Sequence, residues 1–166
     1  WGVPFEVAND GEVTALAGTL SLGRTAMLGL AMGSSEAAGF IDREGRLPGW
    51  LDELAFAPVD LSPDAVADEW SGDRGVGVSY FSQQAVNKLA LRAGFSFPEE
   101  VLLPERLKKV QALAADGDGR ARRVFEDIGI YLGYTIPLYK MYYDFSDALV
   151  LGRVMSAAGG DIIMAK

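Results

Sequence analysis

The stretch RARRVFEDIGIYLGYTIPLYKMYYDFSDALVLGRVMSAAGG, residues 120–160, holds the strongest pattern in the chain. Its apolar residues recur every three or four positions over 120–143 and predict one long amphipathic helix: Val124, Ile128, Leu132, Ile136 and Tyr139. Pro137 should kink that helix, because it has no N–H to bond back to Gly133. A short buried strand over 148–151 and a small-residue turn over 156–160 follow, and the turn leads into a last helix.

Upstream of this stretch, short strands and helices alternate. We predict strands over 3–8, 26–32, 38–42 and 54–59, and helices over 12–20, 81–93 and 104–115. The last three of these strands would form a meander, and the nearly all-apolar run 26–32 is typical of a strand buried on both faces. Residues 71–77 have the composition of a loop. This order of elements predicts a layered α/β domain with a mixed sheet.

The composition excludes several kinds of chemistry. The 166 residues include 15 Lys and Arg against 23 Asp and Glu, and the resulting net charge of −8 argues against nucleic acid as a partner. Cysteine and histidine are both absent, which excludes thiolate and imidazole zinc sites, cysteine nucleophiles and Ser-His-Asp triads. Any general base must therefore be a carboxylate, a lysine or a tyrosine.

The ends of the chain suggest a fragment. The sequence opens on Trp1 and closes at Lys166 inside the last predicted helix, so we expect a longer protein with sequence missing on both sides. No signal peptide and no apolar run of membrane-spanning length are visible. We therefore expect a cytoplasmic protein with no membrane partner.

Two short polar motifs follow predicted strands, where α/β sheets commonly bind ligands. Asn9 and Asp10 lie between a strand and a helix, and a carboxylate there could take a proton from a substrate hydroxyl; the alternative is a helix cap. Gly33, Ser34 and Ser35 follow the buried strand, and their amides and hydroxyls could hold a phosphate. The alternative for this second motif is a plain hairpin turn.

Two further motifs flank the later strands. Glu53 lies beside the predicted strand 54–59 and could bind sugar hydroxyls, or simply face solvent at a strand end. The stretch 152–156, with Gly159 and Gly160 after it, opens the last helix, and close backbone approach at a helix N-terminus suits a nucleotide. It matches neither of the common glycine-rich nucleotide motifs, so a tight strand–helix turn is the alternative.

The order and spacing of these motifs resemble the C-terminal lobe of the ROK family of sugar kinases and repressors. The resemblance covers about Val3 to Lys166 and is best over 121–160, where EDIGIYLGY and ALVLGRVMSAAGG resemble the family's helix and its "VLGGGVSEAG"-like stretch. It implies a ribonuclease-H-like, actin-like ATPase lobe within the hexokinase superfamily, with a mixed sheet flanked by helices. The whole chain, 1–166, would be one lobe of a two-lobe protein.

The resemblance also implies roles for individual residues. Asn9 and Asp10 fall on the family's "ENDANAA" motif, which makes Asp10 the catalytic base and both residues sugar contacts. Glu53 falls on the glutamate of "GEIGH", a further sugar contact. The nucleotide side would be formed by two groups of residues: Gly33, Ser34 and Ser35 at the phosphate turn, and Gly152, Arg153 and Gly159 at the turn before the last helix.

The chain departs from the family pattern at several positions. Phe56 stands where "GEIGH" has its histidine, and residues 71–78 stand where the family has the zinc motif "CGCGxxGCxE". The motif's cysteines are missing, and Val78 falls on its sugar-binding glutamate. Ser35 replaces a glycine of the phosphate turn, and Arg153 replaces one beside the nucleotide. We therefore expect no structural zinc and weaker or altered sugar binding.

The function implied by the resemblance is ATP-dependent phosphorylation of a sugar hydroxyl, with ATP and Mg²⁺ bound between this lobe and a missing N-terminal lobe. The alternative is a non-catalytic sugar-sensing domain like those of the family's repressors. A third interpretation is an oligomerisation domain, which could form a homodimer through a face rich in tyrosine: Tyr131, Tyr139, Tyr142 and Tyr143.

Overall fold

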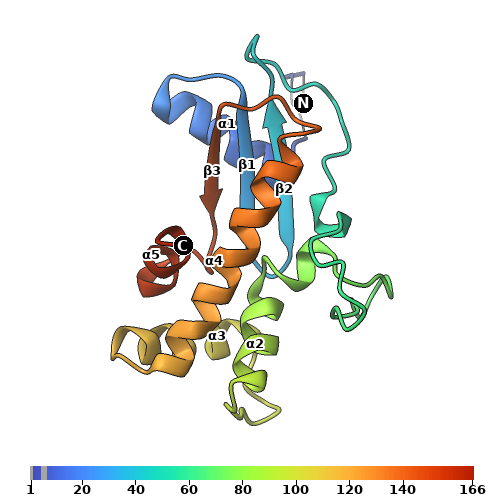
Figure 1. Cartoon of the computed structure of the whole chain (residues 1–166). Coiled ribbons are helices and arrows are strands. Elements are labelled where there is room, and N and C mark those ends of the chain that lie inside the picture. Colours follow the sequence, from blue (N-terminus) through green and yellow to red (C-terminus); the bar gives the residue numbers. More distant parts are fainter. Residues whose placement is uncertain (1, 5–6) are drawn as a thin grey trace.

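The structure, a computed structural model, describes residues 2–4 and 7–166 (Figure 1). Within these residues the elements follow in this order: α1 (Asp10–Leu22), β1 (Met27–Met32), β2 (Glu36–Ile41), α2 (Gln83–Arg92), α3 (Leu103–Ala115), α4 (Gly119–Tyr139), β3 (Asp147–Leu151) and α5 (Ala157–Met164). Every predicted helix is present, with its ends shifted by a few residues. The longest one ends at Tyr139, so that Pro137 lies in its last turn.

The strands form one mixed sheet in the order β2-β1-β3. β1 pairs with β2 in antiparallel register, with Gly29 opposite Gly39, and with β3 in parallel register, with Gly29 opposite Leu149. The antiparallel pair is a hairpin, whereas the parallel pair is joined by the long crossover that contains α2, α3 and α4. The α/β class and the mixed sheet are therefore confirmed.

Three strand predictions need correction. Residues 54–59 form a one-turn 3₁₀ helix at Leu54–Phe56 and a single bridge from Pro58 to Val76, so the predicted meander is wrong. Proline lacks the N–H that a central strand needs, which explains the break. β3 is an edge strand and is only partly buried, which corrects the prediction of a buried strand over 148–151. The predicted strand 3–8 includes residues 5 and 6, which lie outside the described residues; its other residues are not in a strand.

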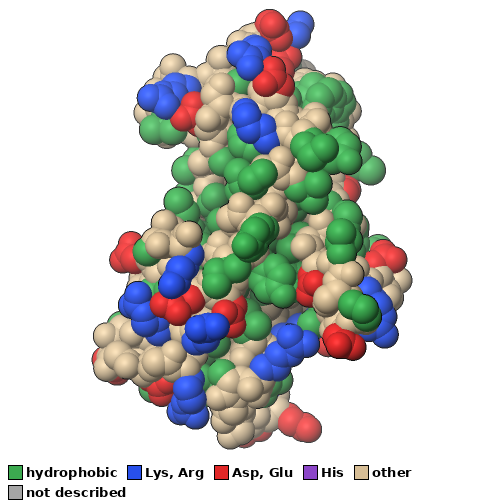
Figure 2. All heavy atoms as spheres, viewed as in Figure 1, with side chains coloured by type: hydrophobic (Ala, Val, Ile, Leu, Met, Phe, Trp, Pro, Cys, Tyr) green, Lys and Arg blue, Asp and Glu red, His purple; other side chains and the backbone are tan. Residues whose placement is uncertain are grey.

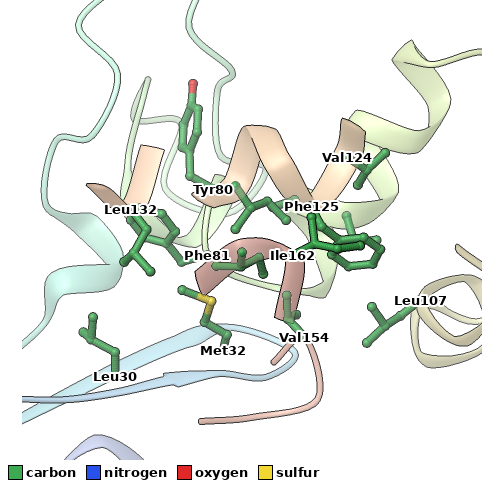
Figure 3. Packing of buried hydrophobic residues seen from close by; sticks show 14 of the residues in the cluster. Leu30, Met32, Tyr80, Phe81, Leu107, Val124, Phe125, Leu132, Val154 and Ile162 are labelled. Carbon is green, nitrogen blue, oxygen red and sulfur yellow. The ribbon is translucent and has the colours of Figure 1, made fainter. Parts of the chain in front are cut away.

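α4 covers one face of the sheet with large side chains (Figure 1). Alternate residues of β1, among them Leu30 and Met32, point toward Phe125, Leu132 and their neighbours on α4. Figure 3 shows these side chains meeting Phe81 from the start of α2 and Ile162 from α5. This cluster is the main hydrophobic core, and it fixes the positions of all the helices of the crossover.

α1 covers the opposite face almost without side chains. A Cβ atom on Gly29 would overlap the backbone of Ala15, and one on Gly39 would overlap the backbone of Glu12. Glycine is required at both strand positions because helix and sheet backbones touch there. This close contact sets α1 against the sheet and fixes where its N-terminus lies.

Candidate functional site

A cleft of about 570 Å³ opens where β1 and β3 end. Five residues predicted to be functional line it: Asp10, Gly33, Ser34, Gly152 and Arg153. They come from three separate places in the sequence, namely the start of α1, the β1–β2 turn and the turn after β3. The carboxyl ends of parallel strands are the usual ligand positions in α/β sheets. The fold thus brings part of each predicted nucleotide-side group together with the predicted base.

At the start of α1, Asn9 caps the helix and its neighbour Asp10 lines the cleft. Asn9 is the N-cap: its Oδ1 accepts from the Glu12 N–H at 2.8 Å, and its own N–H donates to Glu12 Oε2 at 2.8 Å. This reciprocal pair is a capping box. Asp10 is the first residue of the helix and does not serve as the cap. Its carboxylate has no hydrogen-bond partner among the described residues and lines the cleft.

The β1–β2 turn forms a second wall of the cleft. The Gly33 N–H donates to the Ser35 carbonyl at 2.9 Å, which closes the turn, and the Gly33 carbonyl accepts from the Gln83 N–H at 2.9 Å. Ser34 is exposed at the tip and lines the cleft. The second of these bonds ties the turn to the first residue of α2, so the turn cannot move independently of the helix.

The turn after β3 forms the third wall of the cleft, and Gln111 of α3 holds it by hydrogen bonds. Gly152 has φ +110°, and a Cβ on it would overlap the Met32 carbonyl, so only glycine fits. Gln111 of α3 is buried, and its Nε2 donates to the Arg153 carbonyl at 3.0 Å and to the Ser156 carbonyl at 2.8 Å. These bonds leave the Arg153 side chain exposed at the cleft edge.

Four predicted site residues do not line the cleft. Asn9 is engaged in the capping box, and Ser35 turns its hydroxyl to the Glu36 carbonyl at 3.3 Å. Gly159 is buried in α5, where a Cβ would lie 2.8 Å from the Phe125 ring. Glu53 is exposed beside the 3₁₀ helix. Of the predicted sugar contacts only Asp10 lines the cleft, whereas most of the predicted nucleotide contacts do.

The cleft also contains residues that sequence analysis missed. Gln83 and Pro104 enter from the starts of α2 and α3, and Thr14 lies one turn after Asp10 on α1. Gln83 is almost fully buried, and its Oε1 has no hydrogen-bond partner among the described residues. Ser82 as a helix cap was a local signal that α2 begins here, but only the long-range bond to Gly33 places Gln83 in the cleft.

Hydrogen bonds hold the loop over residues 68–73, which overlaps the stretch 71–78 where the family has its zinc motif. Asp68 Oδ2 accepts from the Trp70 N–H at 3.1 Å and the Ser71 N–H at 2.7 Å, and the Asp68 N–H donates to the Asp73 carbonyl at 2.8 Å. The hydrogen bonds that the carboxylate accepts from the Ser71 and Trp70 N–H groups hold the Asp68 pKa below its usual range. In the part of the chain that the structure describes, no three acidic side chains gather in a way that could hold a metal ion.

No helix among residues 2–4 and 7–166 has the length and apolar character needed to cross a membrane. No known family model matches the chain, and no curated protein sequence does either.

Several solved structures share the fold of this chain. A ROK-family transcriptional regulator, described as a homologue of the E. coli MLC protein, is 25% identical with a TM-score of 0.77, over 99% of this chain and 42% of that protein. A ROK-family glucokinase from Streptomyces griseus, solved with glucose and AMPPNP, is 21% identical with a TM-score of 0.76, over 99% and 56%. The ROK hexokinase from Thermus thermophilus is 18% identical with a TM-score of 0.73, over 95% and 53%.

This chain thus spans about half the length of the proteins it matches. The resemblance to the ROK family is confirmed, and so is the actin-like ATPase fold.

Proposed function

Because the chain shares the ROK fold over nearly its whole length, we propose that it is the C-terminal lobe of an ATP-dependent sugar kinase. The observation that carries this proposal is the cleft at the ends of β1 and β3. Asp10 lines this cleft of about 570 Å³ together with the turns at Gly33 and Gly152. Phosphoryl transfer to a hydroxyl uses a base that accepts the hydroxyl proton and groups that position the phosphates, and these residues could supply both.

Asp10 is the general base in this proposal. Asn9 is the N-cap and already accepts from the Glu12 N–H, so Asp10 does not serve as the cap. The Asp10 carboxylate would accept the proton of the sugar hydroxyl while the hydroxyl oxygen attacks phosphorus. The rigid contact between α1 and the sheet holds Asp10 in place during this step.

The other cleft walls suit the phosphates of a nucleotide. Ser34 can donate its hydroxyl, Arg153 brings a positive charge, and Gly152 lets a ligand approach the backbone. ATP with Mg²⁺ would supply the transferred phosphoryl group. In our proposal the second lobe, a partner that this chain does not contain, closes over these residues and excludes water. The isolated lobe should consequently bind ATP weakly.

The decisive experiment is Asp10→Asn in the full-length protein, measured by ADP release over a panel of sugars. General-base catalysis contributes about 10²–10⁴-fold, so kcat should fall by that range while sugar affinity changes little. Asp64→Asn is the matched control, because it removes the same charge from an exposed loop outside the cleft. Unchanged turnover in Asp10→Asn would remove Asp10 as the base.

A non-catalytic sugar sensor is the second candidate. Glu53 lies outside the cleft, Phe56 stands where the family pattern has a histidine, and Val78 falls on its sugar-binding glutamate. The regulator that shares this fold supports the same candidate. A wild-type protein that turns over no sugar, yet gains thermal stability when a sugar is added, would favour the sensor over the kinase.

A further inference from the structure

A second cavity, of about 480 Å³, lies away from the cleft, beside the C-terminal end of α4. Aromatic rings form much of its wall: Trp50, Tyr139, Tyr142 and Tyr143. The loop after β2 and the end of α4 lie side by side here (Figure 1), with the Trp50 and Tyr143 ring centroids 5.7 Å apart. The apolar side chains on this side of the molecule form a band over α4 and the adjacent loop (Figure 2).

One carboxyl group, that of Asp52, lines this aromatic cavity. Asp52 has φ +43°, in the left-handed region, and is 6% exposed. The Leu54 N–H donates to the Asp52 carbonyl at 2.9 Å, closing a tight turn at Glu53 that keeps Asp52 buried and Glu53 exposed. Asp52 Oδ1 is buried and has no hydrogen-bond partner among the described residues. Oδ1 is closed to solvent, so a cation in the cavity would act on the Asp52 charge through space and not by direct contact with this oxygen, and it would offset part of the cost of burying that charge.

The charges around Asp52 are negative. Glu12 and Glu53 both act on it as like charges, and no lysine or arginine lines the cavity. Burial raises the pKa of Asp52 to about 6, opposed by the Tyr143 hydroxyl and the Phe40 N–H. At neutral pH the cavity therefore holds a carboxylate whose charge is not balanced by any cationic side chain of its lining.

From these contacts we propose that the cavity binds a small organic cation, a protonated or quaternary amine. The aromatic side chains that line the cavity, Trp50 and Tyr143 among them, attract the cation and shield its alkyl groups from water. Asp52, which lines the cavity, supplies the opposite charge. A metal ion does not fit this lining, which offers one carboxylate among apolar walls. The site is separate from the proposed kinase cleft and does not depend on the kinase proposal.

Choline and its uncharged isostere 3,3-dimethylbutan-1-ol provide the test, since they differ in charge and hardly at all in shape. Binding is followed by NMR through the tryptophan indole N–H signals at constant ionic strength, with the Trp50 signal assigned from Trp50→Phe. Choline should shift the Trp50 signal and bind at least about tenfold more tightly than the neutral alcohol.

Asp52→Asn removes the charge and retains the shape and the backbone preference, because asparagine also tolerates positive φ. It should weaken choline binding at least about tenfold and abolish the preference over the alcohol. Asp52→Gly is the second variant should the first not fold, and Asp64→Asn is the charge-matched control that should leave binding unchanged. Trp50→Leu should weaken choline binding about threefold or more.

Equal affinity for choline and the alcohol would overturn the proposal, as would choline binding that Asp52→Asn leaves intact. A third outcome would also overturn it: shifts of the Trp50 signal that depend on protein concentration without choline. That result would identify a second copy of the chain as the occupant of the cavity.

Discussion

The two faces of the sheet are packed by opposite means. On the α4 side, buried large side chains such as Phe125 and Leu30 fill the space between helix and sheet. On the α1 side, Gly29 and Gly39 let the backbones touch, and α1 buries only small residues of its own: Gly11, Thr14, Ala15 and Gly18. The α4 face obtains its stability from buried apolar area. The α1 face obtains a short, rigid contact that sets the position of Asp10.

The two faces should therefore respond differently to the same kind of substitution. An extra methyl group has no room on the α1 side, since neither backbone can yield without moving a whole element. A lost side chain on the α4 side leaves a cavity that neighbouring side chains partly fill. The four predictions below test this difference.

Gly39→Ala should have the largest effect. The added Cβ would overlap the backbone of Glu12, so α1 must leave the sheet. We expect a loss of more than about 4 kcal/mol, the range reserved for severe defects, measured by urea unfolding with far-UV circular dichroism. Gly133→Ala is the matched control: it lies inside α4 with no atom near its added Cβ, and should stabilise by about 0.5–1 kcal/mol. A mild effect at Gly39 would show that α1 is not held by backbone contact.

Phe125→Ala tests the opposite face. Phe125 is fully buried between α4 and α5, with its ring against Gly159, and Figure 3 shows it beside Ile162. Removing the ring should cost about 3–5 kcal/mol, and urea unfolding would measure it. Ile130→Ala on the exposed side of the same helix should cost much less, because Ile130 is 43% exposed. Equal costs at the two positions would contradict the assignment of the core to this face.

The α4 face was predictable from sequence, and the α1 face was not. Apolar residues at helical spacing, such as Val124, Ile128 and Leu132, marked the buried side of α4 because large side chains do the packing there. α1 reverses that pattern: it buries glycines and exposes Leu16 and Leu20. Its existence was predicted from the capping residues alone. Which of its sides meets the sheet follows from glycines in β1 and β2, far away in sequence.

The candidate site likewise contains residues that sequence patterns predicted and residues that they did not. Gly33 and Gly152 were predictable because each follows a strand, and strand ends converge in an α/β sheet. Asp10 was predicted after a strand over 3–8 that the described residues do not form, and it reaches the cleft as the first residue of α1. Glu53 was predicted beside a strand that does not exist, and it lies outside the cleft. Gln83 and Gln111 could not be found from local patterns, since their roles rest on bonds to Gly33 and Arg153 from distant helices.

Glu36→Gln sharpens the comparison on the α4 side, where β2 buries a carboxyl group among apolar side chains. Burial raises the pKa of Glu36 to about 8, against a smaller lowering by the Tyr139 hydroxyl 3.4 Å away. The folded state therefore keeps a proton that the unfolded chain releases near pH 4.5. The contribution of Glu36 to stability is greatest at acid pH and falls as the pH rises from about 4.5 to about 8, by roughly 1.4 kcal/mol per unit at most.

The measurement is the free energy of unfolding between pH 6 and 8. Asp52, whose pKa is about 6, is half ionised at pH 6 and about nine-tenths ionised at pH 7, so the slope between pH 7 and 8 reports mainly on Glu36. The Gln variant should flatten the slope and be more stable than wild type at pH 8. A wild-type slope that persists in Glu36→Gln would assign the effect to another group.

Asn9→Ala should have the smallest effect on stability and returns to the α1 side. Asn9 caps the helix through its bond to the Glu12 N–H, and loss of such a cap costs about 0.5–2 kcal/mol. Asn9→Ser retains an acceptor at the same place and should recover most of that loss in a thermal melt.

The cap also holds the first turn of α1, which carries Asp10 at the edge of the cleft. If Asp10 is the base, Asn9→Ala should lower kcat in the full-length protein more than Asn9→Ser does, because the carboxylate would lose its fixed position rather than its chemistry. A helix end that frays in Asn9→Ala without any change in kcat would separate the capping of α1 from the chemistry of the cleft.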